Sequence, residues 1–168
     1  MGSGGLRGTV RTVAIQDQAR IPRLFLVLAL AFFGAVGGAF GSVRWATLEA
    51  IHHLENPTNV TRPGAYGELG AYQFRPTTWR MHTRVPFHRA NDRSVSDVVA
   101  VKHYDWLKRG LEKAGMPATP YNIALAWNGG LSAVVAGTAP AVAHDYASRA
   151  ANLATVFGGA GQGVASAR

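Results

Sequence analysis

The sequence predicts a mostly α-helical domain that follows one N-terminal apolar segment. Three observations support this fold class: apolar residues recur at three- and four-residue spacing, residues typical of helix ends flank these stretches, and no alternating strand pattern occurs. The chain has 168 residues, of which 48% are hydrophobic, so it can bury the core of one domain. Its 20 glycines and 8 prolines indicate many turns between the helices.

The N-terminal region predicts a membrane anchor or a signal segment. Residues 1–23 are basic, and residues 24–41 carry no charged side chain. About 20 residues span a bilayer as a helix, so this segment is just long enough. Its arginine-rich flank predicts a cytoplasmic N-terminus and a domain on the other side of the membrane. The length of both parts favours an anchor, while cleavage after Gly41 would instead release a secreted protein.

Residues 42–157 are expected to form the domain itself. A first helix is predicted from Ser42 to Leu54, ending near Asn56 because Pro57 disfavours the α conformation in the residue before it. Further helices are predicted over residues 74–83, 94–114, 121–127 and 139–157, with loops over 56–73 and 84–93 and a flexible glycine-rich tail over 158–168.

The stretch 94–114 is the strongest helix candidate. Ser94 is a good N-cap, and Gly115 follows the last periodic residue, as glycine does at many helix ends. The apolar stripe expected to face the core consists of Val98, Val101, Leu107 and Leu111.

Composition limits the classes of site and partner. There is no cysteine, so disulfides and thiolate metal sites are excluded, and the six histidines show no metal-binding spacing. No metal or other cofactor is therefore expected. The formal net charge of +8 is compatible with an anionic partner. Because the basic residues are scattered, the sequence does not predict nucleic-acid binding.

Glu55 is the first candidate for catalysis. It is expected in the last turn of the first helix, where the unpaired carbonyl groups disfavour a carboxylate and favour a protonated carboxyl. A carboxyl that keeps its proton near neutral pH is what a general acid needs.

Three sequence blocks around and after Glu55 resemble one enzyme family. They are Gly67–Gln73 (GELGAYQ) followed by Pro76-Thr77, Ala124–Gly130 (ALAWNGG), and Tyr146 with the helix expected around it. In this order they resemble the motifs of the soluble lytic transglycosylases and their goose-type lysozyme relatives. The resemblance covers residues 43–155.

The resemblance implies a lysozyme-like α-rich fold with a substrate groove, and cleavage of the β-1,4 bond between N-acetylmuramic acid and N-acetylglucosamine in peptidoglycan. Glu55 would protonate the glycosidic oxygen and then deprotonate the muramoyl 6-hydroxyl, which closes a 1,6-anhydro ring. The bacterial cell envelope outside the cytoplasm would be the site of action. The expected partners are glycan strands, the membrane through residues 24–41, and envelope-machine proteins of unknown identity. The residues implied to bind substrate are Asn56, Tyr72, Gln73, Trp127, Asn128 and Tyr146.

Some residues depart from the family pattern and leave alternatives open. Asn56 stands where the family has serine, and Trp127 stands where it has tyrosine. If Glu68 faced Glu55 across the groove, it could activate a water molecule, and the enzyme would be a muramidase (a lysozyme). A catalytically silent peptidoglycan-binding module is the alternative from another class. Tyr72 and Trp127 could also be core aromatics, and Asn128 could be a helix C-cap.

Overall fold

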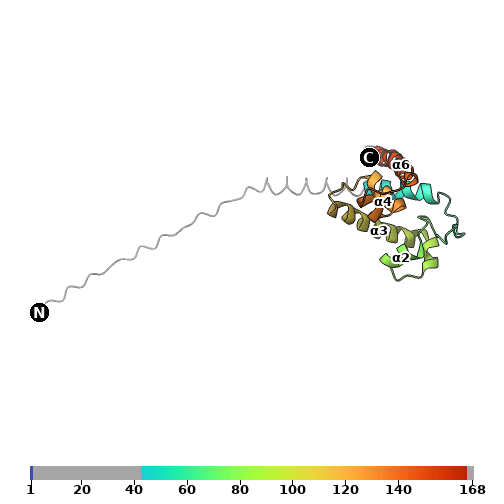
Figure 1. Cartoon of the computed structure of the whole chain (residues 1–168), viewed down its shortest axis with the longest axis horizontal. Helices are drawn as coiled ribbons and strands as arrows, with labels where there is room; N and C mark the ends of the chain where they lie inside the picture. Colours follow the sequence, from blue (N-terminus) through green and yellow to red (C-terminus); the bar gives the residue numbers. More distant parts are fainter. Residues whose placement is uncertain (2–42, 166–168) are drawn as a thin grey trace. The chain divides into compact units, whose positions relative to one another are not determined.

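The computed structural model describes Met1 and residues 43–165, with side chains described as far as residue 159. In this part of the chain the domain is mostly α-helical and has no sheet, as the sequence predicts (Figure 1). The basic region 1–23 and the apolar segment 24–41 lie outside the described residues. None of the helices that the structure describes has both the length and the hydropathy to cross a membrane.

The first element is a helix over residues 43–55. Helix α4 (Pro120–Gly129) lies among three of the helices that are named below. It packs against α3, α5 and α6. In chain order the elements after the first helix are α2 (Pro76–His82), the 3₁₀ helix η1 (Phe87–Asn91), α3 (Arg93–Lys113), α4 (Pro120–Gly129), α5 (Leu131–Val135) and α6 (Ala141–Ala165) (Figure 1).

The first helix ends where proline chemistry predicts. Residue 55 is its last helical residue, and the Asn56 N–H closes the final turn on the His52 carbonyl at 2.9 Å. Pro57 follows and prevents another helical turn. The predicted location of Glu55 in the last turn is therefore confirmed.

Helix α3 forms where the sequence predicts it, but its cap and its buried face differ. Asp92, not Ser94, is the N-cap, and its side chain accepts from the Ser94 and Val95 N–H groups. Val98 is 57% exposed, so the predicted stripe was wrong there. The buried face passes instead through Val99, Ala100, His103, Tyr104, Leu107 and Leu111. Because this face includes polar His103, a stripe chosen by hydrophobicity alone does not coincide with the buried face.

The C-terminal part contains more helix than predicted. No helix was predicted over residues 131–135, but α5 begins there, directly after Gly130, which is the C-cap of α4. Helix α6 continues to Ala165, so the prediction of a flexible tail from residue 158 was wrong for residues 158–165. Packing offers a physical reason: a Cβ added at Gly158 would lie 3.8 Å from the Ala46 Cβ, so this glycine passes against the first helix. Such packing can outweigh the poor helix propensity of glycine.

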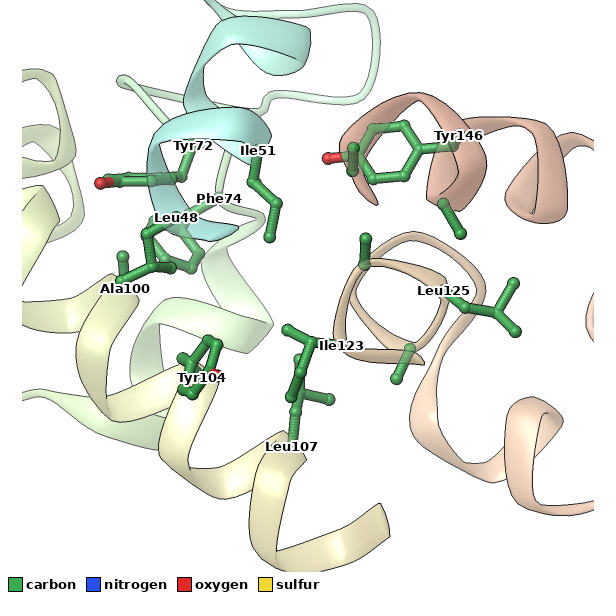
Figure 2. Close-up of a cluster of buried hydrophobic side chains, with 14 of the residues drawn as sticks. Leu48, Ile51, Tyr72, Phe74, Ala100, Tyr104, Leu107, Ile123, Leu125 and Tyr146 are labelled. Atoms are coloured by element: carbon green, nitrogen blue, oxygen red, sulfur yellow. The ribbon is translucent and has the colours of Figure 1, made fainter. Parts of the chain in front are cut away.

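The core lies between the first helix, α3 and α4. Figure 2 shows Ile51 from the first helix, Leu107 from α3 and Ile123 from α4, all of them buried. Trp79 of α2 is 1% exposed and donates its indole N–H to the Val85 carbonyl at 2.7 Å. Trp79 therefore anchors α2 to the core.

A tight turn closes the loop before α2. Leu69 and Phe74 form an antiparallel bridge, with N–H to carbonyl distances of 3.1 and 3.0 Å. Gly70 begins the turn with φ +77, and a Cβ added there would lie 1.8 Å from the Ala90 carbonyl oxygen. Only glycine meets both demands, and the close approach fixes the turn against η1.

Replacing Gly70 with alanine should therefore destabilise the domain by about 3 kcal/mol, through backbone strain and steric overlap together. Gly67→Ala is the matched control: its φ is also positive (+78), but nothing lies within 4 Å of the added Cβ. The control should cost only about 1 kcal/mol. Urea unfolding of both variants measures the difference, and equal losses would contradict the importance of the Gly70–Ala90 contact.

Candidate functional site

A cleft of about 530 Å³ lies where the end of the first helix, the 69–74 turn, α3 and the end of α4 meet. Several residues that are far apart in the sequence converge on it. The sequence-predicted site residues that line it are Glu55, Glu68, Tyr72, Gln73, Trp127 and Asn128.

Glu55 is partly buried in the wall of this cleft. The Tyr146 hydroxyl donates a hydrogen bond to Glu55 Oε1 at 2.8 Å. Burial raises the pKa of Glu55 above its ordinary value; the Tyr146 hydrogen bond opposes this shift, and the negative charge of Glu68 adds to it. The Glu55 carboxyl therefore keeps its proton to higher pH than a solvated glutamate does.

Glu68 is also partly buried at the cleft, but its surroundings act in the opposite direction. Its Oε2 accepts from the Tyr66 N–H at 2.9 Å, and its Oε1 accepts from Arg75 Nε at 3.2 Å. Desolvation alone would raise the pKa of Glu68, but the backbone hydrogen bonds and Arg75 outweigh it and lower the pKa. The cleft thus contains two carboxyl groups with pKa values moved apart, a pattern found in acid–base sites.

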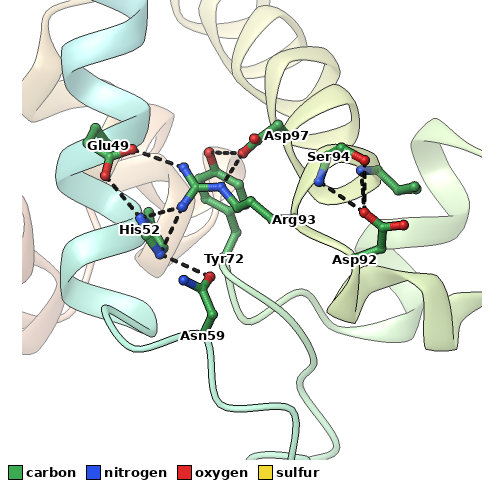
Figure 3. Close-up of polar contacts among 9 residues, drawn as sticks. Glu49, His52, Asn59, Tyr72, Asp92, Arg93, Ser94 and Asp97 are labelled. Carbon is green, nitrogen blue, oxygen red and sulfur yellow. Dashed lines mark hydrogen bonds and ion pairs between the residues drawn. The ribbon is translucent and has the colours of Figure 1, made fainter.

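Tyr72 contributes part of its ring to the cleft while its hydroxyl is held inside the protein. It is 3% exposed, and its hydroxyl donates to Asp97 Oδ1 at 2.7 Å. Arg93 bonds the same carboxylate oxygen at 2.7 Å, reaches Glu49 at 3.0 Å, and lies over the Tyr72 ring (Figure 3). Tyr72 is therefore both a core aromatic and a rigid part of the cleft wall.

Gln73 has an unusual backbone conformation for a residue with a side chain. Its φ is +43, which costs on the order of 1 kcal/mol and is most often found at turns and functional sites. Its Nε2 donates to the Gly70 carbonyl at 3.0 Å. Within the described residues no donor reaches Gln73 Oε1, so this acceptor is available to a ligand in the cleft.

Trp127 and Asn128 come from the last turn of α4. The Trp127 ring lies 4.6 Å from that of His103 and 5.6 Å from that of Phe74, measured between centroids, and Trp127 is partly exposed. Asn128 is exposed at the cleft, and Gly130 is the C-cap of α4. The alternative interpretation of Asn128 as the C-cap was wrong.

Two of the predicted substrate-binding residues do not line the cleft. Asn56 is 6% exposed: its Nδ2 donates to the carbonyls of Val60 and Gly70, at 2.9 and 3.1 Å, and its Oδ1 accepts from the Val60 N–H at 2.8 Å. Because the whole amide is used within the protein, Asn56 ties the first helix to the turn. Tyr146 is also 6% exposed, and its hydroxyl binds Glu55.

His103 is a cleft residue that sequence reasoning missed, because each histidine was treated as isolated. His103 is buried, and its Nδ1 lies 2.9 Å from His82 Nε2. Burial, assisted by the charge of His82, lowers the pKa of His103 to about 3, so it is neutral at physiological pH. The available signal was its four-residue spacing from the buried residues Val99 and Leu107.

The described residues bring no three potential metal ligands together. The cleft combines a carboxyl of raised pKa with aromatic rings and side-chain amides. Comparison of the chain with protein-family profiles, curated proteins and solved structures found no match.

Tyr146→Phe should raise the pKa of Glu55 further, because it removes a hydrogen bond that stabilises the carboxylate while leaving the ring in place. Titration of the Glu55 side-chain carbon by NMR measures this change. Tyr121→Phe is the control, since the Tyr121 hydroxyl contacts exposed His144 instead. An unchanged or lower pKa of Glu55 in the Tyr146 variant would contradict the assigned role of this contact.

Proposed function

We propose that this protein is a peptidoglycan lytic transglycosylase in which Glu55 is the general acid and base. The observation that carries the proposal is the position of Glu55: it lies in the cleft wall with a raised pKa and a hydrogen bond from Tyr146. The convergence of Gln73, Trp127 and Asn128 on the same cleft supports it. These residues belong to the sequence blocks that resemble the lytic transglycosylases.

The proposal includes a lysozyme-like arrangement of the helices, with the cleft as the substrate groove. It also includes a transmembrane or signal helix over residues 24–41, which would hold or export the domain outside the cytoplasm, where peptidoglycan is found. The mostly α-helical domain and the position of the cleft support the first part. The basic flank and the uncharged run in the sequence support the second.

In the proposed reaction, protonated Glu55 donates its proton to the glycosidic oxygen as the bond from C1 of the muramoyl sugar breaks. The substrate's own N-acetyl group stabilises the positive charge that develops at C1. Glu55, now a carboxylate, takes the proton from the 6-hydroxyl while that oxygen bonds to C1. The products are a 1,6-anhydro end and a free 4-hydroxyl, and Glu55 is again protonated. This route needs no second carboxylate, unlike the common two-carboxylate schemes.

Other cleft residues have matching roles in this proposal. Gln73 Oε1 accepts a hydrogen bond from an acetamido N–H, and the partly exposed Trp127 ring packs against a pyranose face. Tyr146 is a positioning residue, since it touches Glu55 and not the cleft. Neutral His103 packs edge-on against the Trp127 ring and helps to hold it in place.

Glu55→Gln should lower the rate of cell-wall lysis by at least about 100-fold, because an amide cannot donate the proton. Turbidity of a peptidoglycan suspension measures lysis, and thermal unfolding checks that the fold is intact. Glu112→Gln is the matched control, since Glu112 is exposed and pairs with Lys108 on α3.

Undiminished lysis by the Glu55 variant would overturn the assignment. If the wild-type protein bound purified cell walls but released no soluble fragments, the protein would be a binding module.

Hydrolysis of the same bond is the second candidate function, and the position of Glu68 in the cleft favours it. Glu68 lines the same cleft with a lowered pKa, so it is ionised and could activate a water molecule. The resulting enzyme would be a muramidase. Mass spectrometry of the soluble products separates the two reactions, because only the transglycosylase forms anhydro ends.

Glu68→Gln tests both reactions through the pH profile. The negative charge of Glu68 helps to raise the pKa of Glu55, so removing it should lower that pKa. Glu55 then loses its proton at lower pH, and the alkaline limb of kcat/KM should move to lower pH. A transglycosylase should keep most of its optimum rate, whereas a muramidase should lose at least about 100-fold. An alkaline limb that stays in place would contradict the coupling between the two carboxyl groups.

A further inference from the structure

A second hollow, of about 440 Å³, lies between α2 and α3, outside the proposed catalytic cleft. The hydrogen-bonded pair His82 and His103 stands between the two: His82 lines the hollow, and His103 lines the cleft. The volume is in the range that small ligands occupy. The residues around it are Met81, His82, Lys102, Asp105, Trp106 and Arg109.

The charge in this hollow is positive. Lys102 and Arg109 lie seven residues apart on α3, on one face of the helix, and both are exposed. Among the described residues Arg109 has no ion-pair partner. The Asp105 carboxylate, which also lines the hollow, pairs instead with Arg44, whose Nη1 lies 3.4 Å from Asp105 Oδ1. Burial lowers the pKa of His82, and the charges of Lys102 and Arg109 lower it further. Both cations line the same hollow.

One wall of the hollow is a flat ring held in a fixed orientation. Trp106 is partly buried and stacks on His103, with 5.6 Å between ring centroids and 12° between the ring planes. His82 meets the Trp106 ring edge-on at 6.3 Å. His103 in turn contacts Trp127, so a continuous set of rings leads from the hollow to the cleft.

A flat aromatic wall beside two cations suits a ligand with an apolar ring face and a negative group. Sugar rings present such faces to aromatic side chains, and Lys and Arg bind carboxylate or phosphate through charge-assisted hydrogen bonds. Lys102 Nζ donates to the His82 carbonyl at 3.4 Å, but a neutral sugar would give neither cation an anionic partner. A free anion without a ring would leave the Trp106 face unused.

We propose that the hollow lined by Lys102, Trp106 and Arg109 binds an acidic saccharide of the cell wall, with its carboxylate or phosphate on the two cations and its ring against Trp106. The choice of a cell-wall ligand rests on the proposed function. The carboxylate would come from the peptide attached to the muramoyl sugar, and the phosphate from an anionic wall polymer. Bound there, the ligand would hold the wall beside the cleft while the cleft holds the bond to be broken.

NMR titration tests the proposal on the full-length protein in a non-ionic detergent, in the Glu55→Gln background so that no probe is consumed. The indole N–H signal of Trp106 is the readout. The probes are an N-acetylglucosaminyl-N-acetylmuramoyl tetrapeptide, a glycosylated glycerol-phosphate oligomer, and neutral tri-N-acetylglucosamine.

At least one acidic probe should shift the Trp106 signal saturably, and the more effective one identifies the source of the anion. Lys102→Gln with Arg109→Gln should weaken that binding at least about tenfold, since both charge-assisted contacts are lost. Arg80→Gln with Lys113→Gln removes the same charge from exposed residues that do not line the hollow, and should leave binding unchanged.

The proposal is overturned if neither acidic probe shifts the Trp106 signal, if the neutral probe shifts it equally, or if the Lys102/Arg109 double variant binds as tightly as its parent. Wall lysis by the protein with Glu55 intact is measured in parallel. Lysis without binding in the hollow would refute only this inference, while binding without lysis would refute only the proposed enzymatic function.

Discussion

The hydrogen bond from Tyr146 to Glu55 is the contact on which the proposed chemistry depends. It joins α6 to the first helix, and its two residues lie 91 positions apart in the chain. Figure 2 shows the Tyr146 hydroxyl pointing toward the helix of residues 43–55. The bond holds in place a carboxyl whose pKa is raised by burial. In the proposed reaction, the last helix of the described domain would therefore set the direction in which the proton is presented. A catalytic proton is useful only when it is aimed at the leaving oxygen.

The neighbourhood of Glu55 explains how one cleft shifts the pKa values of two carboxyl groups in opposite directions. Glu68 is bonded to a backbone N–H and to the Arg75 guanidinium, both of which favour its charged form. Glu55 has a neutral hydroxyl as its partner, and burial is the largest influence on its pKa. The charge of Glu68 then makes ionisation of Glu55 less favourable. The difference arises from local partners, because the two side chains are chemically identical.

Much of the fold could be predicted from local signals. Pro57 ended the first helix as expected, and helices α2, α3 and α4 lie within or close to the ranges predicted for them. The misses have a common physical origin in tertiary contacts. The glycines at positions 158 and 159 indicated a tail by their propensity, yet α6 continues through them, with Gly158 packed toward Ala46.

The motif residues of the candidate site could be predicted from the sequence. Which of them line the cleft, and which are used in contacts within the protein, could not. Glu55, Gln73, Trp127 and Asn128 were named from sequence and do line one cleft. Sequence spacing could not show that the Asn56 amide would be used up by backbone partners. Nor could it show that His82 and His103, on two different helices, would meet at 2.9 Å. Such contacts depend on how the helices pack, which the spacing of residues along the chain does not reveal.

The amide of Asn56 has a consequence for how a ligand would be recognised. Asn56 follows Glu55 directly, and its side chain holds the carbonyl of Gly70, which also receives the side chain of Gln73. The residue after Glu55 and the side chain of Gln73 thus meet at one carbonyl, and Gly70 itself packs against Ala90. A cleft braced in this way loses little conformational entropy on binding. If the proposed function holds, a flexible sugar chain has to adjust its own torsions to the spacing that the protein sets, and ligands that cannot adopt that spacing are rejected by geometry.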